Sequence, residues 1–247
     1  MVGQLQSEAK QSLLTTLAEH QGDAKAALVQ QAIALLVDLS DVSAPAYAPE
    51  LAGCWRLLSA PNFPDGQLTD PGEWQYTLGR LAFDMFRPQD LSVQLTDVFQ
   101  DIQPLPEEAK HTHNIVVHFQ TVQVGLPSVR GIVRNLGVCQ TAHPTALQVQ
   151  FTGGELEPAS DTDLSAWQQV FHSPPQTSVN LRDRLQRLAL KLIFGLGAPQ
   201  KVDAQTGRAD FTMPRSPKGR LNILYLDDTL RIMQSEKEQT LMICERV

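Results

Sequence analysis

The sequence is poor in cysteine, in aromatic residues and in long apolar runs, and each scarcity excludes a class of protein. Cys54, Cys139 and Cys244 are odd in number and far apart in a chain of 247 residues. They predict buried, reduced thiols in a reducing compartment rather than a disulfide framework. No stretch reaches the roughly eighteen uninterrupted apolar residues of a membrane-spanning helix. The N-terminus lacks the pattern of a secretory signal or transit peptide, so we expect a cytoplasmic protein.

Positive charge is also in deficit. The 20 Lys and Arg residues are outnumbered by 27 Asp and Glu residues, which gives a net charge of −7. Such a chain repels a phosphate backbone, so nucleic acid is not expected as a partner. The hydrophobic fraction of 42% and the charged fraction of 19% are ordinary for a globular chain. The chain is therefore expected to fold around a sizeable core, as one domain with an appendage.

Motifs of enzyme active sites are missing as well. Gly195–Gly197 follows an expected helix rather than a strand, so it predicts a helix stop and not a phosphate-binding loop. The densest histidine cluster is His111, His113 and His118, and the sequence locates no further ligands that would complete a metal site around it. We therefore expect no catalytic constellation, no cofactor and no metal.

The first 44 residues predict a helical hairpin that is distinct from the rest of the chain. Apolar residues recur at helical spacing between residues 5 and 17 and again between residues 27 and 39. Between these runs, Gly22 and Asp23 supply a helix stop and a new N-cap. A proline-containing linker follows, so the remaining domain is expected to span residues 45–247.

From Leu51 onward the apolar pattern changes to a period of two, which is typical of strands. Short strands with Pro and Gly between them, and no long helices, favour an antiparallel sandwich or barrel. Asp227 and Asp228 predict a tight turn between two late strands, whereas residues 65–79 predict a long loop. The expected strands cover residues 53–58, 91–99, 114–124, 128–141, 145–151, 221–226, 230–233 and 240–246.

One amphipathic helix, near residues 181–194, is expected to interrupt these strands. Its leucines recur at steps of three and four residues and share one face. Two interpretations stay open: the helix contacts anionic lipid headgroups, or it packs its leucines on the barrel while its basic side chains extend outward. The candidate membrane-contact residues are Arg184, Arg187 and Lys191.

Trp55 is the expected closure of the barrel. It lies two residues after Gly53, at the start of the first strand, where its ring can fill the barrel end while the glycine lets the backbone curve. An arginine from a late strand, Arg231 or Arg246, is expected to stack on this ring in a cation–π contact worth about 1 kcal/mol or more. This arrangement is structural and does not define a ligand.

Residues Leu51–Leu58, followed late in the chain by Tyr225–Ile232 and Leu241–Arg246, resemble the plastid-lipid-associated protein (PAP, or fibrillin) family. The expected N-terminal hairpin is similar to that family's N-terminal segment. The resemblance implies a lipocalin-like barrel that associates with lipid bodies such as plastoglobules, with thylakoid membranes, or with carotenoids, quinones or other apolar molecules. It suits a cyanobacterial member of the family and implies no catalytic residue.

Our main functional hypothesis is therefore non-enzymatic binding of an apolar molecule or lipid at photosynthetic membranes. Alternate residues of each strand point into a barrel and line its interior, which typically holds a ligand of roughly a few hundred Å³. For every candidate the alternative is an ordinary core position. The candidate lining residues are Trp55, Leu57, Phe83, Phe86, Leu95, Phe119, Phe151, Ile223 and Tyr225.

Two other functions stay open. The protein could serve assembly by docking a partner through residues 1–44, which predicts an exposed apolar patch on Leu28, Leu35 and Leu39. Alternatively, an enzyme could act on an apolar substrate inside the barrel, which requires converging polar groups. The polar candidates for that activity are His113, His118 and Asp97.

Overall fold

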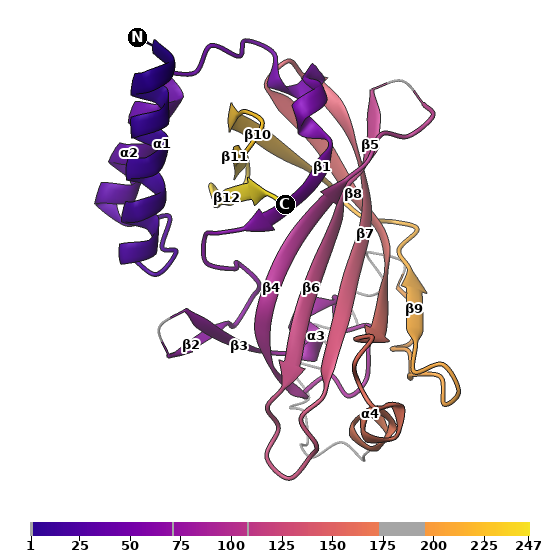
Figure 1. Cartoon of the computed structure of the whole chain (residues 1–247). Helices are drawn as coiled ribbons and strands as arrows, with labels where there is room; N and C mark the ends of the chain where they lie inside the picture. The colour runs from indigo at the N-terminus through magenta and orange to yellow at the C-terminus, as the bar shows by residue number, and fades with distance from the viewer. Residues whose placement is uncertain (1, 71, 108, 173–195) are drawn as a thin grey trace.

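The computed structural model describes the whole chain except residues 1, 71, 108 and 173–195, and shows an eight-stranded antiparallel barrel preceded by two helices (Figure 1). The mainly β fold predicted from the sequence is confirmed. The expected helix at 181–194, with Arg184, Arg187 and Lys191, lies outside the described residues. Around the barrel the strands pair in the order β1 (Gly53–Leu57), β12 (Leu241–Arg246), β11 (Leu230–Ser235), β10 (Lys218–Leu226), β8 (Ala146–Pro158), β7 (Arg130–His143), β6 (Asn114–Thr121) and β4 (Ser92–Ile102).

Pairing of β1 with β4 closes the barrel. Gly53 to Arg56 lie opposite Ile102 to Phe99, and on its other edge β1 pairs with β12. Burial alternates along these strands: in β4, for example, Val98, Gln100 and Ile102 are buried while the residues between them are partly exposed. This period of two explains why the barrel strands were predictable.

The two helices, α1 (Val2–Glu19) and α2 (Ala27–Asp38), form the predicted hairpin and pack on the outer face of β10–β12 (Figure 1). Their turn takes positive φ at Gln21 and Gly22. The Ala60 amide donates to the Gly22 carbonyl at 2.8 Å, which fastens the turn to the segment after β1. Buried residues of both helices meet strand residues that point away from the barrel interior, namely Tyr225, Leu230, Ile232, Leu241 and Ile243.

The prediction of a long loop at residues 65–79 is wrong. Strands β2 (Gln67–Asp70) and β3 (Glu73–Thr77) form a hairpin there, followed by a short helix, α3 (Leu78–Leu81). Strand β3 pairs with the lower half of β4, and Tyr76 is buried against the barrel. The hairpin exists because a distant strand offers an edge, which local Pro and Gly signals do not reveal.

The barrel interior contains two core clusters. We call the upper core the cluster around Trp55, Ile102, Ile223 and Met233, beneath the 3₁₀ helices η1 (Pro45–Tyr47) and η2 (Pro49–Leu51), where the sequence predicted a linker. The lower core contains the buried aromatic side chains of Phe86, Phe119, Trp167, Phe171 and Phe211.

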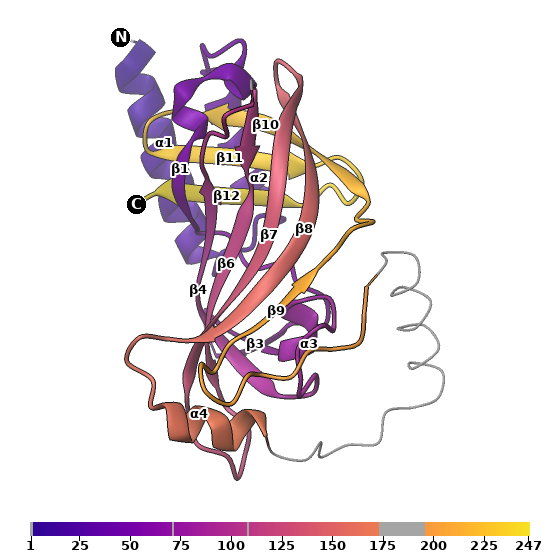
Figure 2. The same cartoon turned by 90° about the vertical axis from the view of Figure 1, so that its right-hand side faces the viewer.

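Three further elements complete the described structure. Helix α4 (Leu164–Phe171), which the sequence analysis did not foresee, lies at the lower end of the barrel (Figure 2). Its N-cap, Asp163, accepts a hydrogen bond from the Ala166 amide at 2.8 Å. Strand β5 (Lys110–Thr112) pairs with β7, and β9 (Ala209–Thr212) pairs with β8. Among the described residues, no helix combines the length and apolar character needed to cross a membrane.

Candidate functional site

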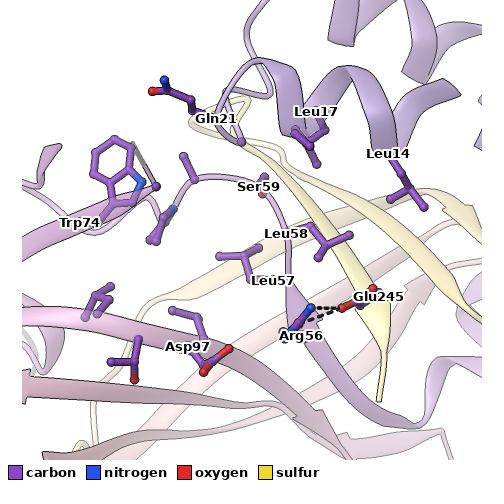
Figure 3. Close-up of a pocket in the computed structure, with 18 residues that line it drawn as sticks. Leu14, Leu17, Gln21, Arg56, Leu57, Leu58, Ser59, Trp74, Asp97 and Glu245 are labelled. Atoms are coloured by element: carbon purple, nitrogen blue, oxygen red, sulfur yellow. Dashed lines mark hydrogen bonds and ion pairs between the residues drawn. The ribbon is translucent and has the colours of Figure 1, made fainter. Parts of the chain in front are cut away.

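A groove of about 480 Å³ opens where the barrel wall parts (Figure 3). One edge of β4 pairs with β1 from Phe99 to Ile102 and with β3 from Ser92 to Gln94. Between these pairings, residues 95–98 have no partner strand on that edge within the described part of the chain. A register shift between Leu95 and Asp97 lies in the same stretch. The groove therefore lies along the unpaired part of this edge of β4, between the residues that pair with β1 and those that pair with β3.

The groove has mostly apolar walls. Helix α1 contributes Leu14 and Leu17 on one side, and Trp74 of β3 lies on the other (Figure 3). Ala18 of α1 also lines the groove. Leu57, Leu58, Leu95 and Val98 come from the parted strands of the barrel wall. The helix, the hairpin and the barrel thus each contribute to one groove, whose residues are far apart in the sequence.

Charged groups lie at the rim of the groove. The Arg56 guanidinium pairs with Glu245, with Nη2 at 2.6 Å and Nε at 2.8 Å from Oε1. Asp97 lies nearby, opposite His118 in the neighbouring strand β6. These groups sum to one net negative charge at the rim, from two carboxylates and one guanidinium.

The nine predicted lining residues do not share one location. Leu57 and Leu95 line the groove. Trp55 and Ile223 lie in the upper core, Phe86 and Phe119 lie in the lower core, and Phe151 packs against the lower core. Phe83 is 38% exposed and contacts the Phe151 ring at 5.4 Å between centroids.

Tyr225 lies on the opposite face of the sheet from the barrel interior, so its prediction as a lining residue is corrected. The register shifts between Ile223 and Tyr225, which turns Tyr225 outward beneath the helix pair. There its hydroxyl donates to Asp227 Oδ2 at 2.7 Å and accepts from Gln6 Nε2 at 3.0 Å. A single bulge reverses which face a side chain occupies.

The predicted closure residues come together where the first barrel strand, β1, pairs with the last, β12, which we call the seam of the barrel. The guanidinium carbons of Arg231 and Arg246 lie 4.7 Å and 4.2 Å from the centroid of the Trp55 ring. Gly53 takes φ of +141°, and a Cβ atom there would collide with the Arg246 guanidinium. The Trp55 indole donates to the Leu51 carbonyl at 3.1 Å. The seam is therefore built from both ends of the β domain.

A polar cluster lies buried beside this seam. Arg231 is fully buried and donates from Nη2 to Gln100 Oε1. Cys139 and Cys244 carry free, buried thiols that interact with the guanidinium, and burial raises the pKa of both thiols. His113 is also buried; burial, followed by the nearby Arg231 charge, lowers the pKa of its imidazole to about 4. His113 is therefore neutral at pH 7.

Of the three polar residues considered for an enzyme, Asp97 and His118 are cross-strand partners, whereas His113 lies in a different cluster. Asp97 borders the groove, and His118 packs its ring against Phe99 at 5.3 Å. His113 belongs to the buried cluster near Arg231. In the part of the chain that the structure describes, no three His, Cys, Asp or Glu side chains gather where they could hold a metal ion.

The fold and the groove define a β-barrel protein with a lateral, mostly apolar groove. Comparison with protein-family models, with curated proteins and with solved structures finds no match to this chain.

Proposed function

We propose that the protein binds an apolar small molecule or a lipid in the lateral groove and performs no catalysis on it. The observation that carries this proposal is an apolar groove of about 480 Å³ between α1 and the parted barrel wall. Small-molecule sites typically measure about 300–1,000 Å³ and are lined mainly by apolar side chains with few polar groups. The groove fits this description, since most of its lining residues are apolar and its charged groups are Arg56, Asp97 and Glu245.

The wider role in this proposal follows the resemblance to the PAP or fibrillin family. In that role a lipocalin-like member binds a carotenoid, a quinone or a lipid and associates peripherally with thylakoid membranes or lipid bodies. Flotation with anionic and neutral liposomes tests the membrane contact through Arg184, Arg187 and Lys191. Replacing all three with Glu is expected to abolish flotation with anionic vesicles, and unchanged flotation would exclude this contact.

Filling the groove tests ligand binding directly. Ala18 is exposed and lines the groove, so Ala18→Trp places an indole in the binding space without disturbing the core. Ala34 is exposed on α2 and does not line the groove, so Ala34→Trp is the matched control. The uncharged fluorescent probe Nile red should bind the wild type and Ala34→Trp equally, and Ala18→Trp at least about tenfold more weakly.

Extraction of the protein from a photosynthetic host identifies the natural ligand. An apolar pigment, quinone or lipid is expected to copurify with the wild type and to be depleted from Ala18→Trp. Equal Nile red binding by all three proteins, together with no copurifying apolar molecule, would contradict the proposal.

A second candidate function is docking of a partner protein through α2. Leu28 and Leu35 are 56% and 55% exposed one heptad apart, whereas Leu39 is half-buried. Exposed apolar side chains on one helix face are typical of an interaction surface. Replacing both exposed leucines with Glu should abolish partner capture and leave Nile red binding intact. Deleting residues 1–44 is a poorer test, because it uncovers the apolar outer face of β10–β12.

A further inference from the structure

Arg231 is a fully buried guanidinium whose hydrogen-bonding capacity is only partly used. Its Nη2 donates to Gln100, but Nε and Nη1 have no hydrogen-bond partner among the described residues. No Asp or Glu of the described chain forms an ion pair with it within 4.0 Å. Trp55 covers one face of the guanidinium. Among the described residues, this buried charge thus has no carboxylate partner.

His113 adds a second unsatisfied polar group in the same region. Its side chain is 2% exposed, and neither ring nitrogen has a hydrogen-bond partner among the described residues. It lies near enough to Arg231 for that charge to affect its protonation. Because a neutral imidazole always carries one N–H, His113 presents one donor without a partner among the described residues, close enough to Arg231 to feel its charge.

These unused donors match a carboxylate. A buried charge without a counterion is costly, and buried polar groups are normally hydrogen-bonded. A guanidinium presents its N–H groups as a planar fork that binds a carboxylate with two parallel hydrogen bonds. Gln100, the two thiols and the Trp55 ring are uncharged and do not neutralise the guanidinium.

The groove lies next to this cluster. Leu57, Cys244 and Arg231 are direct cross-strand partners on β1, β12 and β11, so two strand spacings of about 4.8 Å separate Leu57 from Arg231. Val98, which lines the groove, lies two residues before Gln100 on the same face of β4. Leu57 packs against both core clusters and forms the partition between the groove and the guanidinium.

The rim charges set the orientation of an anionic ligand. Asp97 and Glu245 border the groove, and Glu245 already engages Arg56. A carboxylate at the rim would be repelled, whereas one directed inward past Leu57 would meet the unpaired Arg231 charge. The apolar chain of such a ligand would then lie between α1 and Trp74.

We propose that the ligand is an amphipathic monocarboxylate of the fatty-acid class. Its carboxylate binds the guanidinium of Arg231 and the imidazole of His113 inside the barrel, and its chain occupies the groove. This inference rests on the groove-binding function proposed above and names the ligand class. Leu57 must rotate aside to admit the carboxylate.

Displacement of Nile red from the full chain by laurate and by methyl laurate tests this assignment. The two ligands share one chain, and only laurate carries a charge. The wild type should bind laurate about tenfold or more tightly than methyl laurate, since hydrogen bonds to charged groups provide discrimination of that order. Arg231→Met should bind methyl laurate as the wild type does and lose the preference for laurate.

Two further variants distinguish a carboxylate site at Arg231 from one at the rim. Arg56→Met combined with Glu245→Gln removes the ion pair at the rim without changing the net charge there, and should keep the preference; loss of preference in this double variant alone would place the carboxylate at the rim and overturn the proposal. Arg231→Lys keeps the positive charge but lacks the two parallel N–H groups of a guanidinium. The preference of this variant for laurate over methyl laurate should therefore fall severalfold without disappearing. Arg231→Lys also serves as the test if Arg231→Met does not fold.

The outcomes distinguish this inference from the function on which it rests. Equal binding of laurate and methyl laurate by the wild type, or a preference unchanged in both Arg231 variants, would refute the carboxylate site and leave apolar binding intact. Failure of both ligands to displace Nile red, with no Nile red binding in the groove, would refute the groove function itself.

Discussion

Arg246 makes several of the contacts that hold the barrel seam together. Arg246→Met is therefore expected to lower the stability of the fold. Its Nη1 donates to the Ala52 carbonyl and its Nε to the Asp228 carbonyl, each at 2.7 Å. Its Nη2 donates to the Glu50 carbonyl, and the guanidinium lies over Trp55. One side chain therefore joins the approach to β1, the turn between β10 and β11, and the last strand.

The size of the expected loss in stability follows from these contacts. The site is partly exposed, so we assign about 0.7 kcal/mol to each of the three hydrogen bonds and about 1 kcal/mol to the cation–π contact. The expected loss in the free energy of unfolding is about 3 kcal/mol. For a protein of this size, that loss lowers Tm by about 6–12 °C.

Urea unfolding followed by far-UV circular dichroism measures the effect. Arg56→Met is the matched control, because Arg56 is an arginine on the adjacent strand whose ion pair with Glu245 is exposed. Such a pair contributes about 0–1 kcal/mol. Arg246→Lys should be intermediate, since one ammonium cannot span the same three carbonyls. If Arg246→Met and Arg56→Met destabilise the protein equally, the role of Arg246 in holding the seam together is refuted.

Three other predictions concern separate parts of the fold. Burial raises the pKa of the Asp227 carboxyl, but hydrogen bonds from Lys10, Tyr225 and two amides outweigh it, so the pKa lies below its ordinary value of 3.8. Asp227→Asn should therefore cost about 1–2 kcal/mol at pH 7, and the cost should shrink as pH falls below 3.8, as measured by urea unfolding across pH. His113 has a folded-state pKa of about 4 against an ordinary 6.5, so protonation favours the unfolded state, and stability should fall by on the order of 3 kcal/mol between pH 6.5 and pH 4. His113→Leu should lack that fall; equal losses in both proteins would contradict the burial of a neutral imidazole. A Cβ atom at Gly131 would lie 2.5 Å from Phe119 and 2.6 Å from Trp167, so Gly131→Ala should lower stability by about 1–3 kcal/mol, whereas Gly3→Ala, which meets open space, should not. Thermal unfolding of both glycine variants checks this difference.

The barrel was predictable because most of its strands carry their own signal. Alternation along Leu91–Leu95 and Leu221–Ile223 reports an inward and an outward face wherever the partner strand lies. The pairing of Trp55 with late arginines was also foreseeable, since a large ring beside a glycine at a barrel end invites a stacked cation. The alternation depends on residues that are close in sequence, and the stacked arginine was expected from the role of Trp55 in closing the barrel.

The errors arose where a distant partner decides the local structure. Strands β2 and β3 are short, and β3 is ordered by the free edge of β4. Tyr225 faces the helices because a bulge shifts its register, although unbroken alternation would place it with Ile223. Neither the free edge nor the bulge is encoded in a local period of two.

The groove lies where strand pairing along one edge of β4 stops, and the sequence does not show where that happens. Only Leu57 and Leu95 of its lining residues were therefore predicted. Its other walls come from α1 and from Trp74, which the sequence analysis placed in a hairpin of unspecified packing and in a loop. Alternating apolar and polar residues in Glu73–Thr77 were the one available signal for Trp74. A groove formed by three distant segments follows from their assembly alone.

The same short strand controls barrel closure and the groove. Strand β1 holds Trp55 in the seam and, two residues later, places Leu57 between the groove and Arg231. A ligand that displaces Leu57 must therefore act on the strand that closes the barrel. Because a ligand that binds only the folded state stabilises it in proportion to the logarithm of its concentration, groove occupancy should raise the unfolding temperature of the whole barrel. The seam and the groove are thus coupled through β1, and a weakened seam in Arg246→Met should also weaken ligand binding.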